Sequence, residues 1–570
     1  MQYSQFVELY ESLAKTPKRL EKTSILAEFL KKLKSHGKPQ WIYLLKGRVF
    51  PEYDPREFGI SDKITIKAIS KSSGVSESEI MRKYKKIGDI GDLAESLVAK
   101  RKQSTLFSSK LSTEKVFENL KKLVEIQGHG AVEKKLNLLC EILNFASGKE
   151  AKFIARTLLN DLRVGMADGV IRDSLALAFF KDQPEMIEKI EYAYDLVNDY
   201  SLVFETASKG KKDLEKITII PGRPMKVMLP IKVTDIKEAF RICGIPLAVE
   251  HKYDGFRVLI NKDEKGNISL FTRRLENVTS QFPDVVETIK KHVKASSFIL
   301  DSEVVGFDHK TKKYLPFEAI SQRIKRKYDI DKLQKNLPVE INVFDILYYN
   351  NKAIENLTFK ERRSILTKII KEESYKIRPS MQIVTSKESE ALEFYKKALK
   401  IGEEGIMLKK LDAPYHPGRR VGYMVKMKPD SAEFDLVITG AEYGSGKRAG
   451  WLTSYIVACK SLDNGFLELG KVSTGLKEKE EEGTTYEEMT NILKPLIMDG
   501  KGKEVRIKPK IIVTVKYQNI QRSPSYSSGF ALRFPRITAF RPERGIHDIA
   551  TIKDIEKEVK VIRSNVSGLQ

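Results

Sequence analysis

The sequence has very little cysteine. Its 570 residues include only three, Cys140, Cys243 and Cys459, which are far apart and form no CxxC spacing. Zinc modules and disulfide frameworks both need clustered or paired cysteines, so the sequence predicts neither. Long apolar runs are also missing, because no stretch approaches the roughly 18 apolar residues that a membrane span requires. The first 13 residues alternate polar and apolar side chains, unlike a signal peptide. We therefore expect a cytoplasmic protein without a targeting segment or a membrane partner.

Acidic residues are fewer than basic ones. The chain has 101 Lys and Arg against 77 Asp and Glu, which gives a formal net charge of +24. Such a charge attracts polyanions, and nucleic acid is the first candidate. Ribosomal, chromatin and lysine-rich thermophile proteins share this property, so charge alone does not decide the function. The 41% of hydrophobic residues is enough to build sizeable cores in a soluble protein.

The pattern of apolar residues changes after about residue 220. Helical spacing continues from residue 1 to about residue 220, as in Val116, Phe117, Leu120 and Leu123. A joint rich in proline and glycine follows, and beyond it short strands are separated by turns. We predict a multidomain α+β protein with three parts. These are an all-helical domain (1–220), a mixed α/β domain (221–425) and a small C-terminal β-barrel (426–570).

The segment Glu250-His-Lys-Tyr-Asp-Gly-Phe-Arg257 carries the clearest chemical signal. An extended backbone places Glu250, Lys252 and Asp254 on one face, since side chains alternate along a strand. A lysine acts as a nucleophile only when its amine is neutral, and carboxylates alone oppose that state. A divalent metal with bound phosphates would explain both the acidic neighbours and the activation. Taken alone, the lysine of a KxDG tetrapeptide more often belongs to a surface ion pair. The segments that accompany it in the sequence therefore decide between the two interpretations.

Several downstream segments supply groups that nucleotide chemistry needs. Arg273 closes a predicted hairpin and could bind a phosphate or ribose, while Phe344 on a buried-looking strand could stack on a purine. Asp301 and Glu303 share one face of a strand, an arrangement suited to a hydroxyl and a hard cation. Each also has an ordinary explanation: an exposed hairpin end, a core ring and solvated edge charges.

Two further segments strengthen the same interpretation. Glu404 and Lys409 flank a short apolar run and could supply a metal ligand and a phosphate contact. Taken alone, an ordinary strand with charged ends explains this segment equally well. Lys426 and Lys428 lie on one face of a strand, with Arg420 shortly before them. Like charges side by side are costly unless an anion lies between them, so this cluster indicates phosphate binding.

In this order, the segments resemble the motifs of the covalent nucleotidyltransferase superfamily, and most closely the archaeal and eukaryotic type of ATP-dependent DNA ligase. Residues 531–536, ALRFPR, resemble the closing motif of these ligases, and residues 156–165 resemble the signature of their helical DNA-binding domain. The resemblance covers nearly the whole chain. It implies a helical DNA-binding domain, an adenylation domain and an oligonucleotide-binding (OB-fold) barrel, in agreement with the three predicted parts.

The resemblance implies that the protein seals nicks between a 5′-phosphate and a 3′-hydroxyl in duplex DNA during replication, repair and recombination. Lys252 would attack ATP to form lysyl-AMP, AMP would pass to the 5′-phosphate, and the 3′-hydroxyl would then expel AMP. Mg²⁺ is the implied metal, which Mn²⁺ could replace. Nicked DNA is the implied partner of a nucleoid-associated monomer, and phosphate contacts would make binding independent of sequence and sensitive to salt.

The resemblance also assigns roles to individual residues. Glu303 and Glu404 match the metal-binding carboxylates, and Arg533 and Arg536 match contacts to DNA or the leaving pyrophosphate. Tyr423 lies in a stretch where many relatives have tryptophan, a departure that removes no chemically required group. The residues implied to bind ATP are Glu250, Arg257, Arg273, Glu303, Phe344, Arg420, Lys426 and Lys428.

A weaker signal is the segment QSTLF at residues 103–107. It resembles a short peptide that binds a sliding clamp, with Gln103, Leu106 and Phe107 as the implied contacts. A basic surface loop with two incidental apolar residues explains the segment as well.

Two other functions fit part of the sequence. An RNA ligase or capping enzyme would share the lysine chemistry but leaves the helical region and residues 532–536 unexplained. A DNA-bridging protein without catalysis would explain the charge, yet it needs neither the lysine nor the metal carboxylates. NAD as the AMP donor is disfavoured, because ligases that use it usually carry a zinc module that three scattered cysteines cannot build.

Overall fold

A computed structural model describes residues 1–101, 110–315, 317–325, 330–429, 432–444, 448, 450–463, 465–478 and 483–567. The chain forms two compact units. The first consists of Met1–Ile231, Asp254–Met381 and Lys409–Met424, and the second of Lys232–Tyr253, Gln382–Leu408 and Val425–Gln570.

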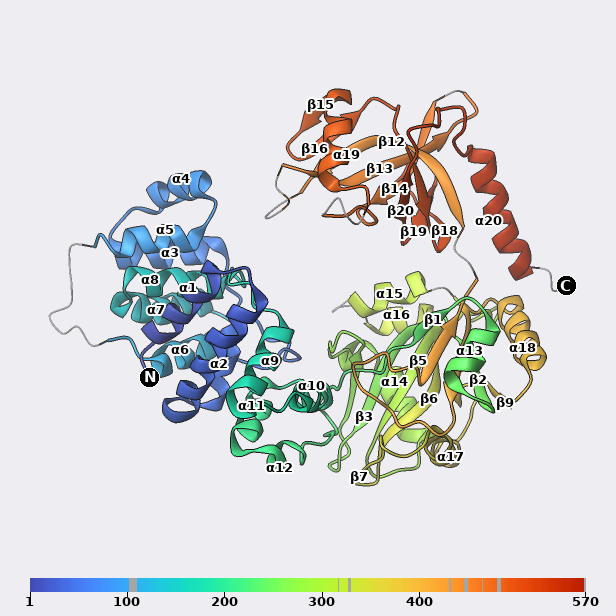
Figure 1. The fold of residues 1–570 in the computed structure, drawn as a ribbon, viewed down its shortest axis with the longest axis horizontal. Helices are drawn as coiled ribbons and strands as arrows, with labels where there is room; N and C mark the ends of the chain where they lie inside the picture. The colour runs from blue at the N-terminus through green and yellow to red at the C-terminus, as the bar shows by residue number, and fades with distance from the viewer. Residues whose placement is uncertain are drawn as a thin grey trace. The chain divides into compact units, whose positions relative to one another are not determined.

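The first unit begins with a helical region (Figure 1). Apolar residues at helical spacing form its core: Val116, Phe117, Leu120 and Leu123 of α6 are all buried. The Ser112 side chain caps this helix by accepting a hydrogen bond from the Lys115 backbone N–H (3.1 Å). The predicted all-helical N-terminal region is therefore confirmed. Its α-helices are α1 (Ser4–Lys15), α2 (Arg19–His36), α3 (Asp62–Ser73), α4 (Glu77–Ile87), α5 (Ile90–Val98), α6 (Thr113–Glu125), α7 (Ala131–Phe145), α8 (Gly148–Leu158), α9 (Asp168–Phe179), α10 (Glu185–Val197), α11 (Tyr200–Lys209) and α12 (Lys211–Leu214).

A six-stranded sheet follows in the first unit, with strand order β4-β3-β5-β6-β7 and β8 parallel to β6. The predicted hairpin is confirmed, because β3 pairs antiparallel with β4. On its other side, β3 pairs with β5 and sets Arg257 opposite Glu303. The strands are β3 (Phe256–Lys262), β4 (Ile268–Thr272), β5 (Phe298–Gly306), β6 (Val339–Tyr349), β7 (Lys352–Ala353) and β8 (Ile377–Pro379), and the helices are α14 (Pro283–His292), α15 (Phe317–Lys325), α16 (Ile330–Asn336) and α17 (Phe359–Ile369).

A five-stranded sheet with the order β1-β11-β10-β2-β9 carries the segment that ends at Lys252. The buried side chains of β2 are apolar from Leu247 to Val249, which explains why this stretch forms an interior strand. Helix α18 packs against β2 and against α13. The elements are β1 (Ile231–Val233), β2 (Leu247–Lys252), β9 (Gln382–Thr385), β10 (Gly405–Lys410), β11 (Met424–Met427), α13 (Ile236–Cys243) and α18 (Glu388–Lys400).

The C-terminal part of the second unit is rich in β-structure, as predicted. Its seven-stranded sheet has the order β14-β13-β12-β16-β15, and β17 pairs with both β12 and β20. A separate pair joins β18 to β19. The elements are β12 (Glu433–Tyr443), β13 (Leu452–Lys460), β14 (Phe466–Val472), β15 (Ile497–Lys501), β16 (Glu504–Ile507), β17 (Ile512–Lys516), β18 (Asn519–Arg522), β19 (Phe530–Arg533), β20 (Arg536–Phe540), α19 (Tyr486–Leu493) and α20 (Ile552–Ser567).

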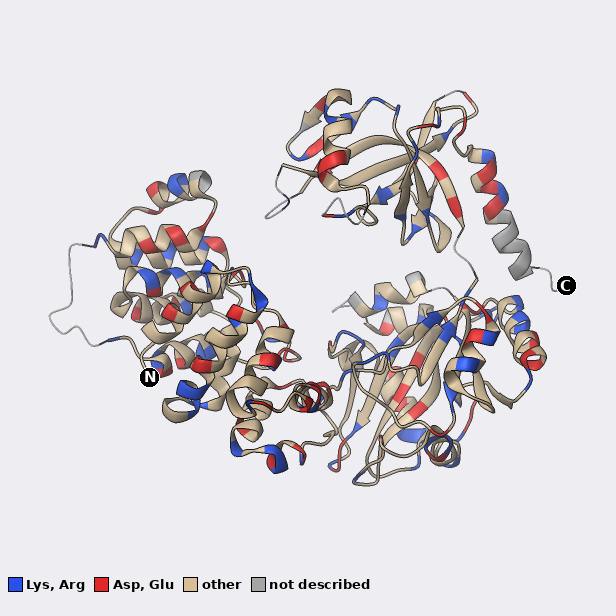
Figure 2. Ribbon diagram, viewed as in Figure 1, with Lys and Arg blue, Asp and Glu red and all other residues tan. Residues whose placement is uncertain are grey.

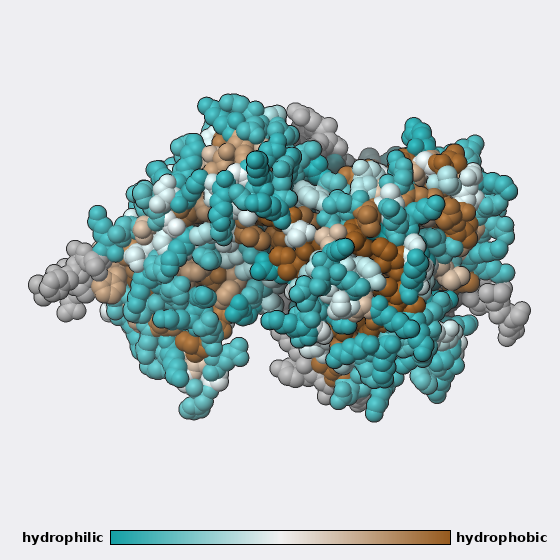
Figure 3. Space-filling view, turned by 90° about the horizontal axis from the view of Figure 1, so that it is seen from below, coloured by the Kyte–Doolittle hydropathy of each residue, from teal (hydrophilic) through white to brown (hydrophobic). Residues whose placement is uncertain are grey.

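The surface is predominantly polar. Basic and acidic residues occur throughout both units (Figure 2), and the face drawn in Figure 3 is mainly hydrophilic with smaller apolar patches. Within the described parts of the chain, no helix has the length and apolar character needed to cross a membrane.

Candidate active site

Two glycines allow close backbone contacts beside the predicted nucleophile. A Cβ atom on Gly255 would lie 2.3 Å from the Val304 carbonyl oxygen, so only glycine lets β3 begin this close to β5. Gly405 has φ of +144°, and a Cβ there would lie 2.2 Å from the Met427 carbonyl oxygen. These contacts give a steric reason for the glycine that follows Asp254 and for the one that follows Glu404.

In the second unit, Glu404 forms ion pairs with two lysines. Its carboxylate pairs with the Lys252 ammonium group and lies 2.6 Å from Lys428 Nζ. The Glu404 backbone N–H also donates to the Lys252 carbonyl oxygen (2.9 Å), which ties the end of β2 to the start of β10. Burial raises the pKa of Glu404, but the Lys252 and Lys428 ammonium groups lower it by more, to about 2. The cluster therefore contains two cations around one stable carboxylate.

The second unit also contains Glu250 and Lys426. Glu250 is 1% exposed and accepts a hydrogen bond from Gln382 Nε2 (2.7 Å), its neighbour across the β2–β9 pair. Lys426 is half-buried on β11. Gln382 is a site residue that sequence reasoning missed, and nothing local could have indicated it, because it lies 132 positions from Glu250.

In the first unit, Arg257 belongs to a buried hydrogen-bond network. Its guanidinium group donates to both Asp301 carboxylate oxygens (2.9 and 2.5 Å) and to the Met228 carbonyl oxygen (2.8 Å). The Tyr415 hydroxyl donates to Asp301 (2.7 Å) and accepts from the Met228 backbone N–H (2.8 Å). Burial and the Asp301 carboxylate raise the pKa of Tyr415 well above its ordinary value, so it remains a donor.

This network changes the interpretation of Asp301. The sequence pattern places Asp301 with Glu303 as a pair suited to a ligand. In the structure Asp301 is fully buried and its oxygens are bound by Arg257 and Tyr415, whereas Glu303 is half-buried. Asp301 is thus an internal anchor, because residues distant in sequence occupy its carboxylate.

Two cationic side chains lie near the ring of Phe344. The Arg257 guanidinium carbon is 5.3 Å from the ring centroid, and Lys409 Nζ is 4.7 Å from it. Lys409 also donates to the Phe344 carbonyl oxygen (3.4 Å) and is 3% exposed. Phe344 itself is half-buried between the buried residues Val343 and Asp345. Its ring is therefore held in place while remaining partly accessible.

Arg273 and Arg420 form an exposed basic group in the first unit. Within the described part of the chain, neither guanidinium makes a hydrogen bond or an ion pair. Partial burial and the positive charges of Arg257 and Arg420 lower the pKa of Arg273. An anion bound here would relieve the part of this shift that comes from the neighbouring positive charges.

The predicted metal carboxylates suit Mg²⁺ in chemistry but do not enclose an ion by themselves. Among the described residues, no group of three or more His, Cys, Asp or Glu side chains is arranged to hold a metal. Glu303 in the first unit and Glu404 in the second are hard oxygen donors. Mg²⁺ commonly takes one or two carboxylates and completes its shell with substrate phosphates and water, so these residues fit that mode.

The predicted C-terminal contacts lie at a turn between β19 and β20. Arg533 ends β19 and is half-buried, and Arg536 begins β20 and is exposed. Between them, Phe534 has φ of +50° and is 68% exposed, with the Arg533 guanidinium 5.2 Å from its ring centroid. An exposed aromatic residue in this backbone conformation is uncommon, and the sequence analysis missed it.

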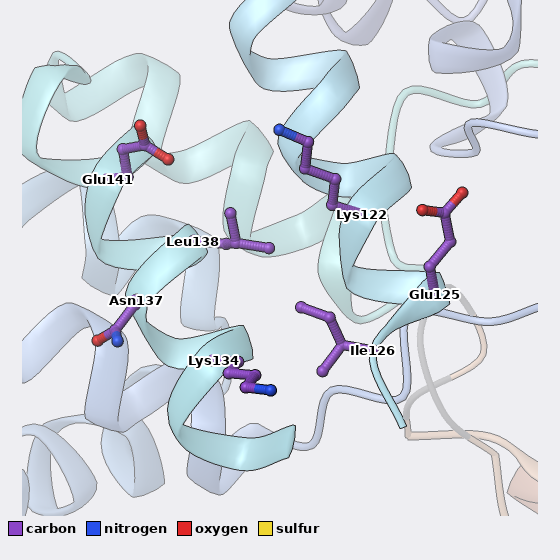
Figure 4. A pocket seen from close by; sticks show the side chains of 7 residues that line it. All are labelled: Lys122, Glu125, Ile126, Lys134, Asn137, Leu138 and Glu141. Carbon is purple, nitrogen blue, oxygen red and sulfur yellow. The ribbon is translucent and has the colours of Figure 1, made fainter. Parts of the chain in front are cut away.

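The predicted clamp contacts Gln103, Leu106 and Phe107 fall outside the described residues. An open pocket lies between α6 and α7 in the helical region (Figure 4). Its lining contains none of the predicted site residues and consists of Lys122, Glu125, Ile126, Lys134, Asn137, Leu138 and Glu141.

The fold is shared with a solved ligase structure. The structure named Pmar-Lig_PreS3 matches with a TM-score of 0.55 at 17% sequence identity, and the match covers 94% of this chain and 99% of that one. At this identity the likeness concerns the fold alone.

Sequence comparisons define the family. Residues 2–176 match the model described as DNA ligase N terminus, residues 227–428 the ATP dependent DNA ligase domain, and residues 448–544 the ATP dependent DNA ligase C terminal region. A DNA ligase from Nanoarchaeum equitans is 44% identical over 571 residues, covering 99% of this chain and all of the relative. A DNA ligase from Thermococcus onnurineus is 40% identical, covering 97% of each. The chain belongs to the ATP-dependent DNA ligase family, whose members seal nicks in DNA.

Proposed function

We propose that this ligase joins DNA through AMP covalently attached to Lys252. The observation that carries the assignment is the Lys252–Glu404–Lys428 cluster, in which a partly exposed lysine lies beside a carboxylate and a second cation. Here two lysines pair with the same half-buried carboxylate, so two ammonium groups lie close together at a position suited to a phosphate.

In the first step, Lys252 Nζ attacks the α-phosphorus of ATP, a P–N bond forms, and the bond to pyrophosphate breaks. The attacking amine must be neutral, so Lys252 must separate from Glu404 and lose a proton to solvent before the bond forms. Lys426 and Lys428 bind the α-phosphate, and Arg273 and Arg420 bind the more distal phosphates or the ribose. When bound at Glu303 and Glu404, Mg²⁺, or Mn²⁺ in its place, would neutralise phosphate charge and compete with Lys252 for the Glu404 carboxylate.

The base is recognised by a buried carboxylate and an aromatic ring. Glu250 accepts a hydrogen bond from the exocyclic amine of adenine, and Gln382 keeps the carboxylate in the required orientation. Phe344 stacks on the purine, while Arg257 and Lys409 hold its ring. Arg257 thus supports the nucleotide site mainly through its bonds to Asp301 and Phe344.

The remaining two steps act on DNA. The 5′-phosphate at the nick takes AMP from Lys252, and the 3′-hydroxyl then attacks that phosphate and releases AMP. Arg533 and Arg536 contact the DNA or the pyrophosphate that leaves in the first step. Because these contacts are made to phosphates, DNA binding does not depend on the base sequence.

The decisive experiment uses α-labelled ATP and Mg²⁺ with the whole chain. The unmodified protein should acquire label that nicked DNA discharges into a sealed strand, and Lys252→Ala should acquire none. Lys262→Ala is the matched control, because Lys262 is also the last residue of a strand, β3, but belongs to the other sheet and donates to the Ala295 carbonyl oxygen (2.9 Å). Equal labelling of the Lys252 variant would reject the assignment, and labelling from NAD alone would reject ATP as the donor.

We also propose that the ligase acts as a nucleoid-associated monomer that binds a sliding clamp through Gln103, Leu106 and Phe107. Replacing both Leu106 and Phe107 by alanine should abolish clamp binding and leave joining of nicked oligonucleotides unchanged. Clamp affinity that does not change would exclude this segment as the contact. Light scattering at assay concentrations tests the monomer, and a dimer mass would contradict it.

A further inference from the structure

The loop from Tyr415 to Arg420 connects the nucleotide site of the first unit to the helical region. Its first residue, Tyr415, is bound to Asp301 and to the Met228 backbone. Its last residue, Arg420, is exposed and is proposed above to bind an ATP phosphate. The residues between them contact α10 and the chain that follows α12. The helical region therefore borders the loop that presents Arg420.

Two backbone hydrogen bonds hold this loop, one at Gly418 and one at Arg419. The Gly418 N–H donates to the Val227 carbonyl oxygen (3.2 Å), and the Leu229 N–H donates to the Arg419 carbonyl oxygen (3.1 Å). Gly418 has φ of +74°, and a Cβ at this position would lie 1.9 Å from Asp195 Oδ2 on α10. Only glycine allows the loop to pass this close to the helix.

The side chain next to Arg420 is bound to α10 by several charged contacts. Arg419 Nε donates to Glu191 (3.0 Å), its Nη2 atom also contacts that carboxylate, and its Nη1 atom donates to Glu188 (3.1 Å). Glu191 is also bound by Arg172 Nη1 (2.7 Å) from α9. Arg419 Nε and Nη2 contact the same Glu191 oxygen, and together with the Nη1 bond to Glu188 they restrict the orientation of the guanidinium group. Burial raises the pKa of Glu191, but Arg419 and Arg172 lower it by more, so it stays charged.

An aromatic contact completes the attachment. His416 and Tyr192 meet edge to face with ring centroids 5.3 Å apart. The loop residues on both sides of Pro417 are thus fixed to one face of α10. Arg420, by contrast, makes no hydrogen bond or ion pair to any described residue that could orient its guanidinium group. Its direction is set by the backbone that Arg419 anchors.

We propose that Glu191 is a positioning residue for the reaction with ATP. It acts through Arg419, whose attachment to α10 aims the neighbouring Arg420 at the nucleotide, and it touches no substrate itself. The inference rests on the proposed role of Arg420. Its consequence is that the helical region contributes to formation of lysyl-AMP and is more than a DNA-binding module.

The test measures the rate of lysyl-AMP formation against ATP concentration with the full chain. Glu191→Gln should raise the KM for ATP by about threefold to tenfold with little change in the maximal rate, since it weakens one orienting ion pair. Glu191→Asp keeps the charge and should recover most of the loss. Glu185→Gln is the matched control, because Glu185 lies on the same helix but pairs 4.0 Å from Lys211 within the helical region. It should leave the KM unchanged.

A double-mutant cycle distinguishes a positioning role of Glu191 from a general disturbance of the structure. Arg420→Ala should raise the KM for ATP by about tenfold or more, and adding Glu191→Gln to it should cause no further increase. An unchanged KM for Arg420→Ala would show that Arg420 does not bind ATP, which removes the basis of the inference. A raised KM for Arg420→Ala with no effect of Glu191→Gln would overturn the positioning role alone. Equal, additive effects would show that Glu191 acts independently of Arg420 and would also overturn it.

Discussion

Replacing Asp301 by asparagine tests the buried network beneath the nucleotide site. The Asp301 carboxylate is 0% exposed and accepts two hydrogen bonds from Arg257 and one from Tyr415. Asparagine has nearly the same shape, but it removes the charge that balances the Arg257 guanidinium, which is only 13% exposed. Breaking a buried pair by removing one partner costs about 3 to 5 kcal/mol. We expect a loss near the lower value, because Arg257 retains its bond to the Met228 carbonyl oxygen.

Amide hydrogen exchange is the appropriate assay. A chain with several domains does not unfold in a single transition, so a global free energy of unfolding is not defined. Exchange reports local opening, and a loss of about 3 kcal/mol should speed exchange in β3 and β5 on the order of a hundredfold. Lysyl-AMP formation should also slow by at least tenfold, because the network holds Arg257 and the Tyr415 loop in place.

Asp284→Asn is the matched control. Asp284 also pairs with a buried arginine, Arg323, which is 1% exposed, but the pair joins α14 to α15 and includes no predicted site residue. The Asp284→Asn substitution should speed amide exchange in α14 and α15. The rate of lysyl-AMP formation should stay within about twofold of that of the unmodified protein, since no group proposed to bind the nucleotide moves. Unchanged exchange in β3 and β5 of the Asp301 variant would refute the argument that this carboxylate balances a buried charge.

Three further outcomes follow from the described contacts. Gly405→Ala should speed amide exchange in β10 and β11 and abolish lysyl-AMP formation, because its Cβ would meet the Met427 carbonyl oxygen, whereas Gly402→Ala, with φ of +91° and no atom within 4 Å, should cost only about 1 kcal/mol of local stability. The depressed pKa of Glu404 stabilises the structure around it by about 3 kcal/mol above its unfolded pKa, and this contribution is lost as pH falls from about 4.5 to 2. The difference in local exchange rate between the protein and Glu404→Gln should therefore shrink over that range, and a constant difference would contradict the assignment. Binding of nicked DNA should weaken on the order of a thousandfold between 50 and 200 mM salt, as about 6 phosphate contacts would require, and a flat salt dependence would exclude phosphate recognition.

Local structure around the nucleophile could be predicted from the sequence. The alternation of apolar residues and the turn at Asp263 to Asn267 predict the β3–β4 hairpin, and the Asp263 N–H indeed donates to the Asn267 carbonyl oxygen (3.0 Å). Strand and turn formation depend on neighbouring residues, so a single sequence contains the relevant information. The helical, mixed and β-rich character of the three successive regions was predictable for the same reason.

The partners of the charged residues could not be predicted in this way. Asp301 is bound by Arg257, 44 positions earlier, and by Tyr415, 114 positions later. The anchoring of Arg419 to Glu191 spans 228 positions. Such contacts depend on strand register and on the packing of helices against loops, which no local pattern of residue types specifies. The catalytic roles of the clustered residues stay predictions until the labelling experiments are made.

The ion pair between Lys252 and Glu404 affects how readily this lysine reacts with small electrophiles. A neutral amine reacts with many electrophiles that cells contain, among them aldehydes, thioesters and acyl phosphates, whereas an ammonium ion does not. Lys252 is 22% exposed, so small reagents can reach it, and its ion pair holds it beside the Glu404 carboxylate. In the proposed mechanism, a ligand that takes over Glu404 would free the amine for attack. Until then, the ion pair would limit acylation of the lysine on which the proposed chemistry depends.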